Sequence, residues 1–173
     1  MSYDFHLFNP SLDRESNTSI KGSGDAESAA INPGPIDPDA EHRKRELAEA
    51  LIRSNPELEI FQFGFERIAE LEGVTVDEAR IRYRHLELNG SEDGNGIQIT
   101  LFDHSVSITV PYWHTGSDAA KVFQEIWMYL RILKSHGKLS VFDPQLDRII
   151  NLDTDYDDVV NRYTGVVERI DEG

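Results

Sequence analysis

The sequence predicts an α+β fold in which amphipathic helices pack on one face of an antiparallel β-sheet. Between residues 84 and 110, three segments alternate apolar with polar side chains, as strands with one buried and one wet face do. Between 115 and 136, apolar residues recur at the three- and four-residue spacing of a helix that buries one side. The chain has no internal repeat, and its 173 residues fit a single domain over 1–173.

The first strand is expected at the start of the chain. Tyr3, Phe5 and Leu7 alternate with polar residues, which predicts a half-buried strand over 2–8. From 11 to 36 the chain is rich in Ser, Gly, Asn, Asp and Pro and poor in apolar residues, so burial cannot offset the entropy cost of ordering it. We expect a flexible loop over 11–36 rather than a tail, because the preceding strand should belong to the sheet.

A long helix is expected after this loop. Asp37 suits an N-cap and Pro38 suits the first helical position, so a helix should begin there. Leu47 and Leu51 should then face the core. The basic cluster at 43–45 is flanked by glutamates, which predicts a solvated helix face with local ion pairs.

Two short helices are expected over 65–71 and 76–83. In the first, Leu71 is assigned to the inward stripe; in the second, Thr75 and Glu78 match a capping box. The pair resembles a helix-turn-helix in outline. Acidic residues at the start of the second helix would face phosphates, so DNA binding is disfavoured.

The three alternating segments predict a meander with one apolar and one polar face. A glycine-rich loop over 90–96 should join the first two strands, and a turn at Asp103 and His104 the last two. The polar face should present His85, Glu87, Gln98, Thr100, Ser107 and Thr109. His85 and Glu87 are the weak catalytic candidates, as an acid/base pair.

The rest of the chain predicts further elements of the same fold. Two short strands are expected over 139–142 and 148–152, joined by a turn at Asp143 and Pro144. A final amphipathic helix should follow from Tyr156 to about residue 170.

Composition and charge limit the classes of function. With 32 acidic and 17 basic residues the formal net charge is −15, which disfavours nucleic-acid binding and favours a basic protein partner. The start of the chain lacks the pattern of a signal peptide, no run of apolar residues is long enough to span a membrane, and the chain has no cysteine. We therefore expect a cytoplasmic location, no membrane association and no cofactor.

Two segments are candidate partner-binding sites. Tyr112, Trp113 and His114 follow the last meander strand, and aromatic residues of this kind are favoured at interfaces. His104, at the preceding turn, is grouped with them.

The second segment contains Asp153, Asp155, Asp157 and Asp158. It opens like an EF-hand loop, but the sixth position is not glycine and the twelfth is not glutamate, so no metal site is expected. These carboxylates can complement the dipole at a helix start, and they are also candidates for attracting a basic partner.

The hypothesis favoured by these observations is an acidic protein-binding module, either an adaptor or an inhibitor. An inhibitor could resemble an immunity protein that neutralises a basic enzyme such as a nuclease toxin. A small-molecule-binding protein or enzyme that uses the polar sheet face is the first alternative. A homo-oligomeric structural subunit is the second, and the sequence does not determine the oligomeric state.

Overall fold

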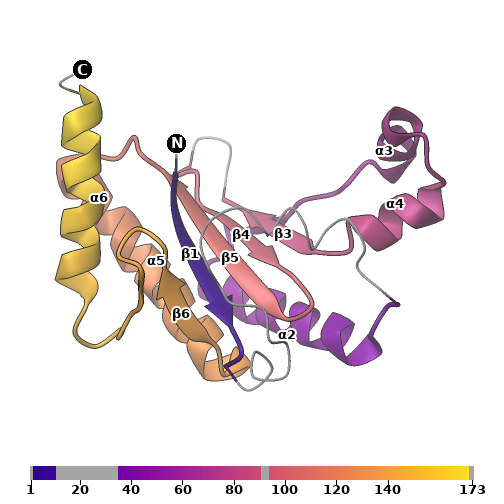
Figure 1. The fold of residues 1–173 in the computed structure, drawn as a ribbon, viewed down its shortest axis with the longest axis horizontal. Coiled ribbons are helices and arrows are strands. Elements are labelled where there is room, and N and C mark those ends of the chain that lie inside the picture. The colour runs from indigo at the N-terminus through magenta and orange to yellow at the C-terminus, as the bar shows by residue number, and fades with distance from the viewer. Residues whose placement is uncertain (1, 11–34, 91–93, 172–173) are drawn as a thin grey trace.

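The computed structural model contains one seven-stranded antiparallel sheet, with strand order β2-β3-β4-β5-β1-β6-β7 (Figure 1). It describes residues 2–10, 35–90 and 94–171. The strands are β1 (Ser2–Phe8), β2 (Glu59–Ile60), β3 (Leu86–Asn89), β4 (Gln98–Leu101), β5 (Ser105–Pro111), β6 (Ser140–Asp143) and β7 (Arg148–Ile149). The helices are α2 (Pro38–Ser54), α3 (Phe65–Glu72), α4 (Val76–Arg82), α5 (Gly116–Gly137) and α6 (Tyr156–Asp171). The α+β class and the predicted meander β3-β4-β5 are confirmed.

The N-terminal strand is an inner strand of the sheet, between β5 and β6. β1 pairs with β5 along its whole length and with β6 on its other side. Two strands from later in the chain, β5 and β6, therefore pair with β1. In this way β1 joins the meander to the C-terminal hairpin β6-β7. This position could not be predicted from the alternation of residues 2–8.

One face of the sheet forms the core. Phe5, Ile108, Ile99 and Leu88 lie side by side in register across β1, β5, β4 and β3, and all are fully buried. Helices α2 and α5 lie behind this face, and α6 stands at its β6 side (Figure 1). The predicted inward stripe of α5 is confirmed, because its members are all buried: Val122, Phe123, Ile126, Trp127, Leu130 and Leu133.

The helix starts follow the expected capping chemistry. The Asp37 side chain accepts a hydrogen bond from the backbone amide of Asp39 at 3.0 Å, and Pro38 is the first helical residue. Thr75 and Glu78 form the complete capping box at the start of α4. These signals are local, which is why the sequence predicts them correctly.

Lys44 corrects the prediction of a solvated basic face on α2. Its side chain is 2% exposed, and its Nζ lies 3.0 Å from Oδ1 of Asp103 and donates to the carbonyl oxygen of Arg84 at 2.7 Å. Glu41, one turn earlier in α2, also pairs with Lys44. Arg84 completes the cluster by pairing with Asp103. Two partners come from distant segments, so the spacing of charges along α2 could not reveal the cluster.

Helices α3 and α4 form an arm that projects from the β2–β3 edge of the sheet (Figure 1). We define the arm as residues 60–83. The two helices pack mainly on each other, and each buries a single alanine, Ala69 in α3 and Ala79 in α4. Leu71 was predicted to face inward but is 74% exposed, because it lies two residues after Ala69 and so points to nearly the opposite side of the helix.

Aromatic side chains join the arm to the outer face of the sheet. The ring centroid of Phe63 lies 5.0 Å from that of His85, which lies 5.5 Å from that of Phe102, the residue after β4. Phe61 and Tyr83 extend this chain of ring contacts. The arm is therefore held by contacts that are only partly buried.

Two predictions concern segments outside the described residues. The predicted loop at 11–36 lies there except for its last two residues, as does the middle of the loop at 90–96. Among the helices that are described, none has the length and apolar composition needed to cross a membrane.

Candidate functional site

Trp113 is the most exposed of the predicted aromatic candidates, with 64% of its surface accessible. Its ring nevertheless lies against Gly96. A Cβ atom on Gly96 would lie 2.6 Å from Cζ2 of Trp113, and Gly96 has a φ of +69°. Only glycine both adopts this backbone conformation easily and leaves room for the indole. The indole is thus held in place on one side and open on the other.

Polar contacts fix the segment beneath Trp113. The Nε2 of His114 donates to the carbonyl oxygen of Asn95 at 2.7 Å, and the side chain of Asn95 donates to Glu125 of α5 at 2.6 Å. Asn55 and Tyr129 also donate to the Glu125 carboxylate. The segment that carries Trp113 is therefore linked through Asn95 to Glu125 of α5, and the same carboxylate accepts from Asn55 at the C-cap of α2.

Tyr112 belongs more to the core than to the surface. Its ring stacks on Tyr163 of α6 with centroids 5.2 Å apart, and burial raises the pKa of its hydroxyl. The Tyr163 hydroxyl donates to the carbonyl oxygen of Pro111 at 2.6 Å and accepts from the backbone amide of His114. Of the predicted aromatic cluster, Trp113 alone is largely accessible to a partner.

His104 does not join this cluster. It is exposed in the turn that begins β5, whereas Trp113 follows the end of β5. A seven-residue strand separates them by about 20 Å. Next to His104, Asp103 pairs with Lys44 and Arg84, and these hydrogen bonds outweigh the opposing effect of burial and lower the pKa of its carboxyl.

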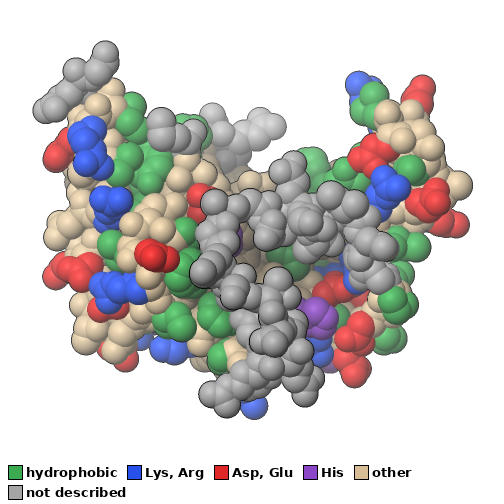
Figure 2. Space-filling model, viewed as in Figure 1, with side chains coloured by type: hydrophobic (Ala, Val, Ile, Leu, Met, Phe, Trp, Pro, Cys, Tyr) green, Lys and Arg blue, Asp and Glu red, His purple; other side chains and the backbone are tan. Residues whose placement is uncertain are grey.

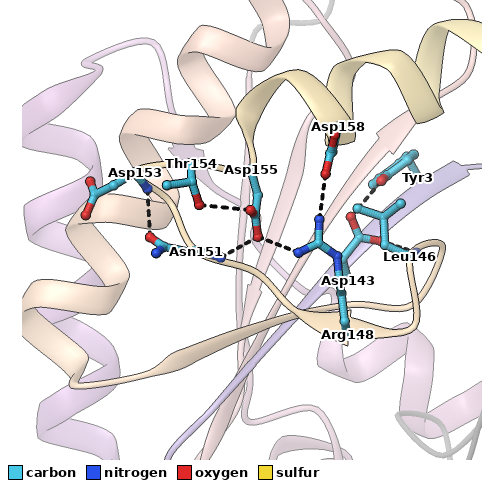
Figure 3. Close-up of polar contacts among 9 residues, drawn as sticks. All are labelled: Tyr3, Asp143, Leu146, Arg148, Asn151, Asp153, Thr154, Asp155 and Asp158. Atoms are coloured by element: carbon cyan, nitrogen blue, oxygen red, sulfur yellow. Dashed lines mark hydrogen bonds and ion pairs between the residues drawn. The ribbon is translucent and has the colours of Figure 1, made fainter.

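The four predicted aspartates mostly have partners within the chain (Figure 3). Asp155 is largely buried and accepts from the backbone amide of Asn151 and from Arg148, both at 2.8 Å. Asp158 also pairs with Arg148, at 2.8 Å, and Asp153 pairs with Arg131 at 3.0 Å. The backbone hydrogen bond from Asn151 is the main reason that the pKa of Asp155 is lowered.

These contacts stabilise the turn before α6. The carboxylates of Asp153, Asp155 and Asp158 therefore have a structural role. Asp157 is exposed, and no ion pair involves it among the residues that the structure describes. Nowhere in the described chain do three or more His, Asp or Glu side chains gather as a metal site would require.

A buried carboxylate lies near the same loop (Figure 3). Asp143, at the end of β6, is fully buried and accepts a hydrogen bond from the Tyr3 hydroxyl at 2.6 Å. Backbone amides of Gln145 and Leu146 donate to its other oxygen. Burial raises the pKa of Asp143 despite these hydrogen bonds. The contact ties β1 to the β6–β7 turn.

His85 and Glu87 share the outer face of the sheet, as predicted, but no hydrogen bond joins them in the described structure. His85 packs between Phe63 and Phe102, and burial lowers the pKa of its imidazole. Nearby Lys44 adds to this effect, while Glu87 opposes it. The side chain of Glu87 instead accepts from Asn89 at 2.9 Å. The geometry favours a packing role for His85 over acid/base chemistry.

The arm contains exposed apolar side chains that the sequence-based candidates did not include. Ile60, Phe61, Leu71 and Ile81 are four of the nine large hydrophobic residues that are exposed in the described chain. In Figure 2 the arm stands out at the upper right, where hydrophobic atoms lie among carboxylates and basic groups. The sequence held one signal for this exposure: Leu71 lies two residues after Ala69, a spacing that already conflicts with its assignment to the inward stripe.

No protein-family model matches this chain, and comparisons with curated proteins and with solved structures found no match either.

Proposed function

We propose that this chain is a protein-binding module, an adaptor or inhibitor, whose partner is a basic protein. The observation that carries the proposal is the exposed indole of Trp113, one edge of which lies against Gly96. Tryptophan is enriched among the residues that dominate binding energy at protein interfaces. A side chain that is already fixed loses little rotamer entropy when a partner covers it.

Charge supports a basic partner. The formal net charge of −15 would attract a positively charged protein before the two come into contact. This long-range attraction is strongest at low salt, because ions screen it. An exposed indole face also binds the ammonium or guanidinium group of a partner by cation–π attraction. The chain has no cysteine, which suits a reducing compartment, and we therefore propose that it acts in the cytoplasm.

The test is affinity capture from a native lysate with the purified chain as bait, at low and at high salt. Wild-type protein should retain a basic partner at low salt and lose it at high salt. Trp113→Ala should weaken the measured affinity for that partner by about 2 kcal/mol or more. Ile149→Ala, which shortens another exposed apolar side chain, should leave it unchanged.

The proposal would be abandoned if Trp113→Ala bound the captured protein as tightly as wild type did. Capture of an acidic partner with salt-independent affinity would contradict the role of charge.

A further inference from the structure

His85 is the side chain through which the aromatic rings of the arm meet the sheet. The centroid of its imidazole lies 5.0 Å from that of Phe63 and 6.2 Å from that of Tyr83, near the two ends of the arm. It also lies 5.5 Å from the ring centroid of Phe102, the residue after β4. Among the described residues, every ring contact between the arm and the rest of the chain involves His85. The imidazole therefore forms a bridge between the arm and the sheet.

The helices of the arm pack mainly on each other rather than on the sheet. The backbone amide of Phe61 donates to the carbonyl oxygen of Glu87 at 2.8 Å and fixes the start of the arm. Gly64 comes directly before α3, and a Cβ atom at this position would have nothing within 4 Å. Because glycine rotates freely and this one lies in open space, Gly64 can act as a hinge about which α3 and α4 move together.

A positive charge on His85 has no partner in this arrangement. The ring is half-buried among three aromatic side chains. Glu87 shares its face of the sheet, but the carboxylate of Glu87 accepts from Asn89, and no hydrogen bond joins it to His85 in the described structure. Burial lowers the pKa of His85, and the positive charge of Lys44 on α2 adds to this effect, while Glu87 opposes it.

The other ionisable groups near His85 already have partners. Asp103 and Arg84 pair with each other, and the Tyr83 hydroxyl donates to Glu72 within the arm. An imidazolium that displaced one of these groups would break an existing interaction. Moving into water requires only the release of ring contacts, so solvation is the easier route for the charged ring.

We propose that the arm is a pH-responsive element that leaves the outer face of the sheet when His85 becomes charged. The neutral ring packs between Phe63 and Phe102 and holds the arm in place. The charged ring is solvated once the arm turns at Gly64, and α3 and α4 keep their mutual packing. Proton binding favours the released arrangement, so its population rises as the pH falls below the ordinary histidine pKa of about 6.5.

The test measures the position of the arm directly. The chain has no cysteine, so Leu71→Cys on the arm and Ile149→Cys on β7 provide two unique sites for spin labels. Both side chains are largely exposed, at 74% and 58%. In double electron–electron resonance, the distance distribution between the labels should be narrow at about pH 7 and should gain a second, broader component at about pH 5.

Matched variants in the same labelled chain assign the movement to His85. His85→Phe keeps a ring at this position but cannot bind a proton, so its distance distribution should be the same at both pH values. His6→Phe removes an exposed histidine from β1 and should leave the response unchanged. In NMR of the full-length chain, the His85 imidazole should titrate below about pH 6.5, at the midpoint of the distance change. The indole signal of the buried Trp127 should not move, because the core takes no part.

The inference is overturned if the distance distribution is the same at both pH values, or if His85→Phe responds as the wild type does. A His85 midpoint above about pH 6.5 would also overturn it, because attraction between the imidazolium and the aromatic rings would then hold the arm in place. Movement that occurs only together with loss of the native Trp127 signal would show general unfolding instead. Trp113 has no ring contact with His85 in the described chain, so the proposed function and the movement of the arm can fail separately.

Discussion

Replacing Lys44 with methionine tests whether the cluster on α2 stabilises the fold. Methionine keeps the aliphatic part of the side chain but removes the charge that lies between Asp103 and Glu41. It also leaves the carbonyl oxygen of Arg84 without this donor. Breaking a fully buried ion pair costs about 3–5 kcal/mol, because the remaining charge is desolvated and uncompensated.

The expected loss is smaller here. Asp103 keeps its pair with Arg84, and the side chain of Glu41 is 25% exposed. We therefore expect Lys44→Met to lower the free energy of unfolding by about 2–3 kcal/mol. For a protein of this size, that corresponds to a melting temperature about 5–10 °C lower.

The measurement is urea unfolding followed by circular dichroism, with Lys121→Met as the matched control. Lys121 pairs with Asp118, but its side chain is 74% exposed. A pair in that position adds little to stability, so the control should unfold like wild type. If Lys44→Met also stayed within about 0.5 kcal/mol of wild type, the argument that a buried cation holds this cluster together would be wrong.

Three further predictions concern single sites. The pKa of His85 is lowered in the folded chain, so at acidic pH the unfolded chain binds more protons than the folded chain does. The free energy of unfolding should therefore decrease as the pH is lowered through about 6.5. In urea unfolding measured between pH 7 and pH 5, the free energy of unfolding of His85→Phe should decrease less than that of wild type, and an equal decrease would contradict the assignment to His85. Gly96→Ala should cost about 1–2 kcal/mol from its positive φ and should shift the indole NMR signal of Trp113, and an unchanged signal would show that the ring does not depend on Gly96. Tyr3→Phe removes a donor to the buried Asp143 and should cost about 1–3 kcal/mol in thermal unfolding, whereas an unchanged stability would mean that solvent replaces the hydroxyl.

The sequence by itself determined the elements with a local cause. Alternation gave β1 and the meander, the stripe from Val122 to Leu133 gave α5, and the caps at Asp37 and Thr75 gave two helix starts. In each of these the interacting groups lie within a few residues of one another, or one periodic pattern marks the buried side. The residue type made Trp113 a candidate for partner binding, but the sequence did not predict its contact with Gly96.

Tertiary structure decided which of the charged and apolar side chains remain available. Lys44 has the same local neighbours as Arg43 and Arg45, and only the approach of Asp103 and Arg84 buries it. Asp155 and Asp158 share Arg148, while His104 and Trp113 lie at opposite ends of β5. Whether a side chain is paired, buried or free depends on groups far away in the chain, and the order of the strands determines which of those groups come near.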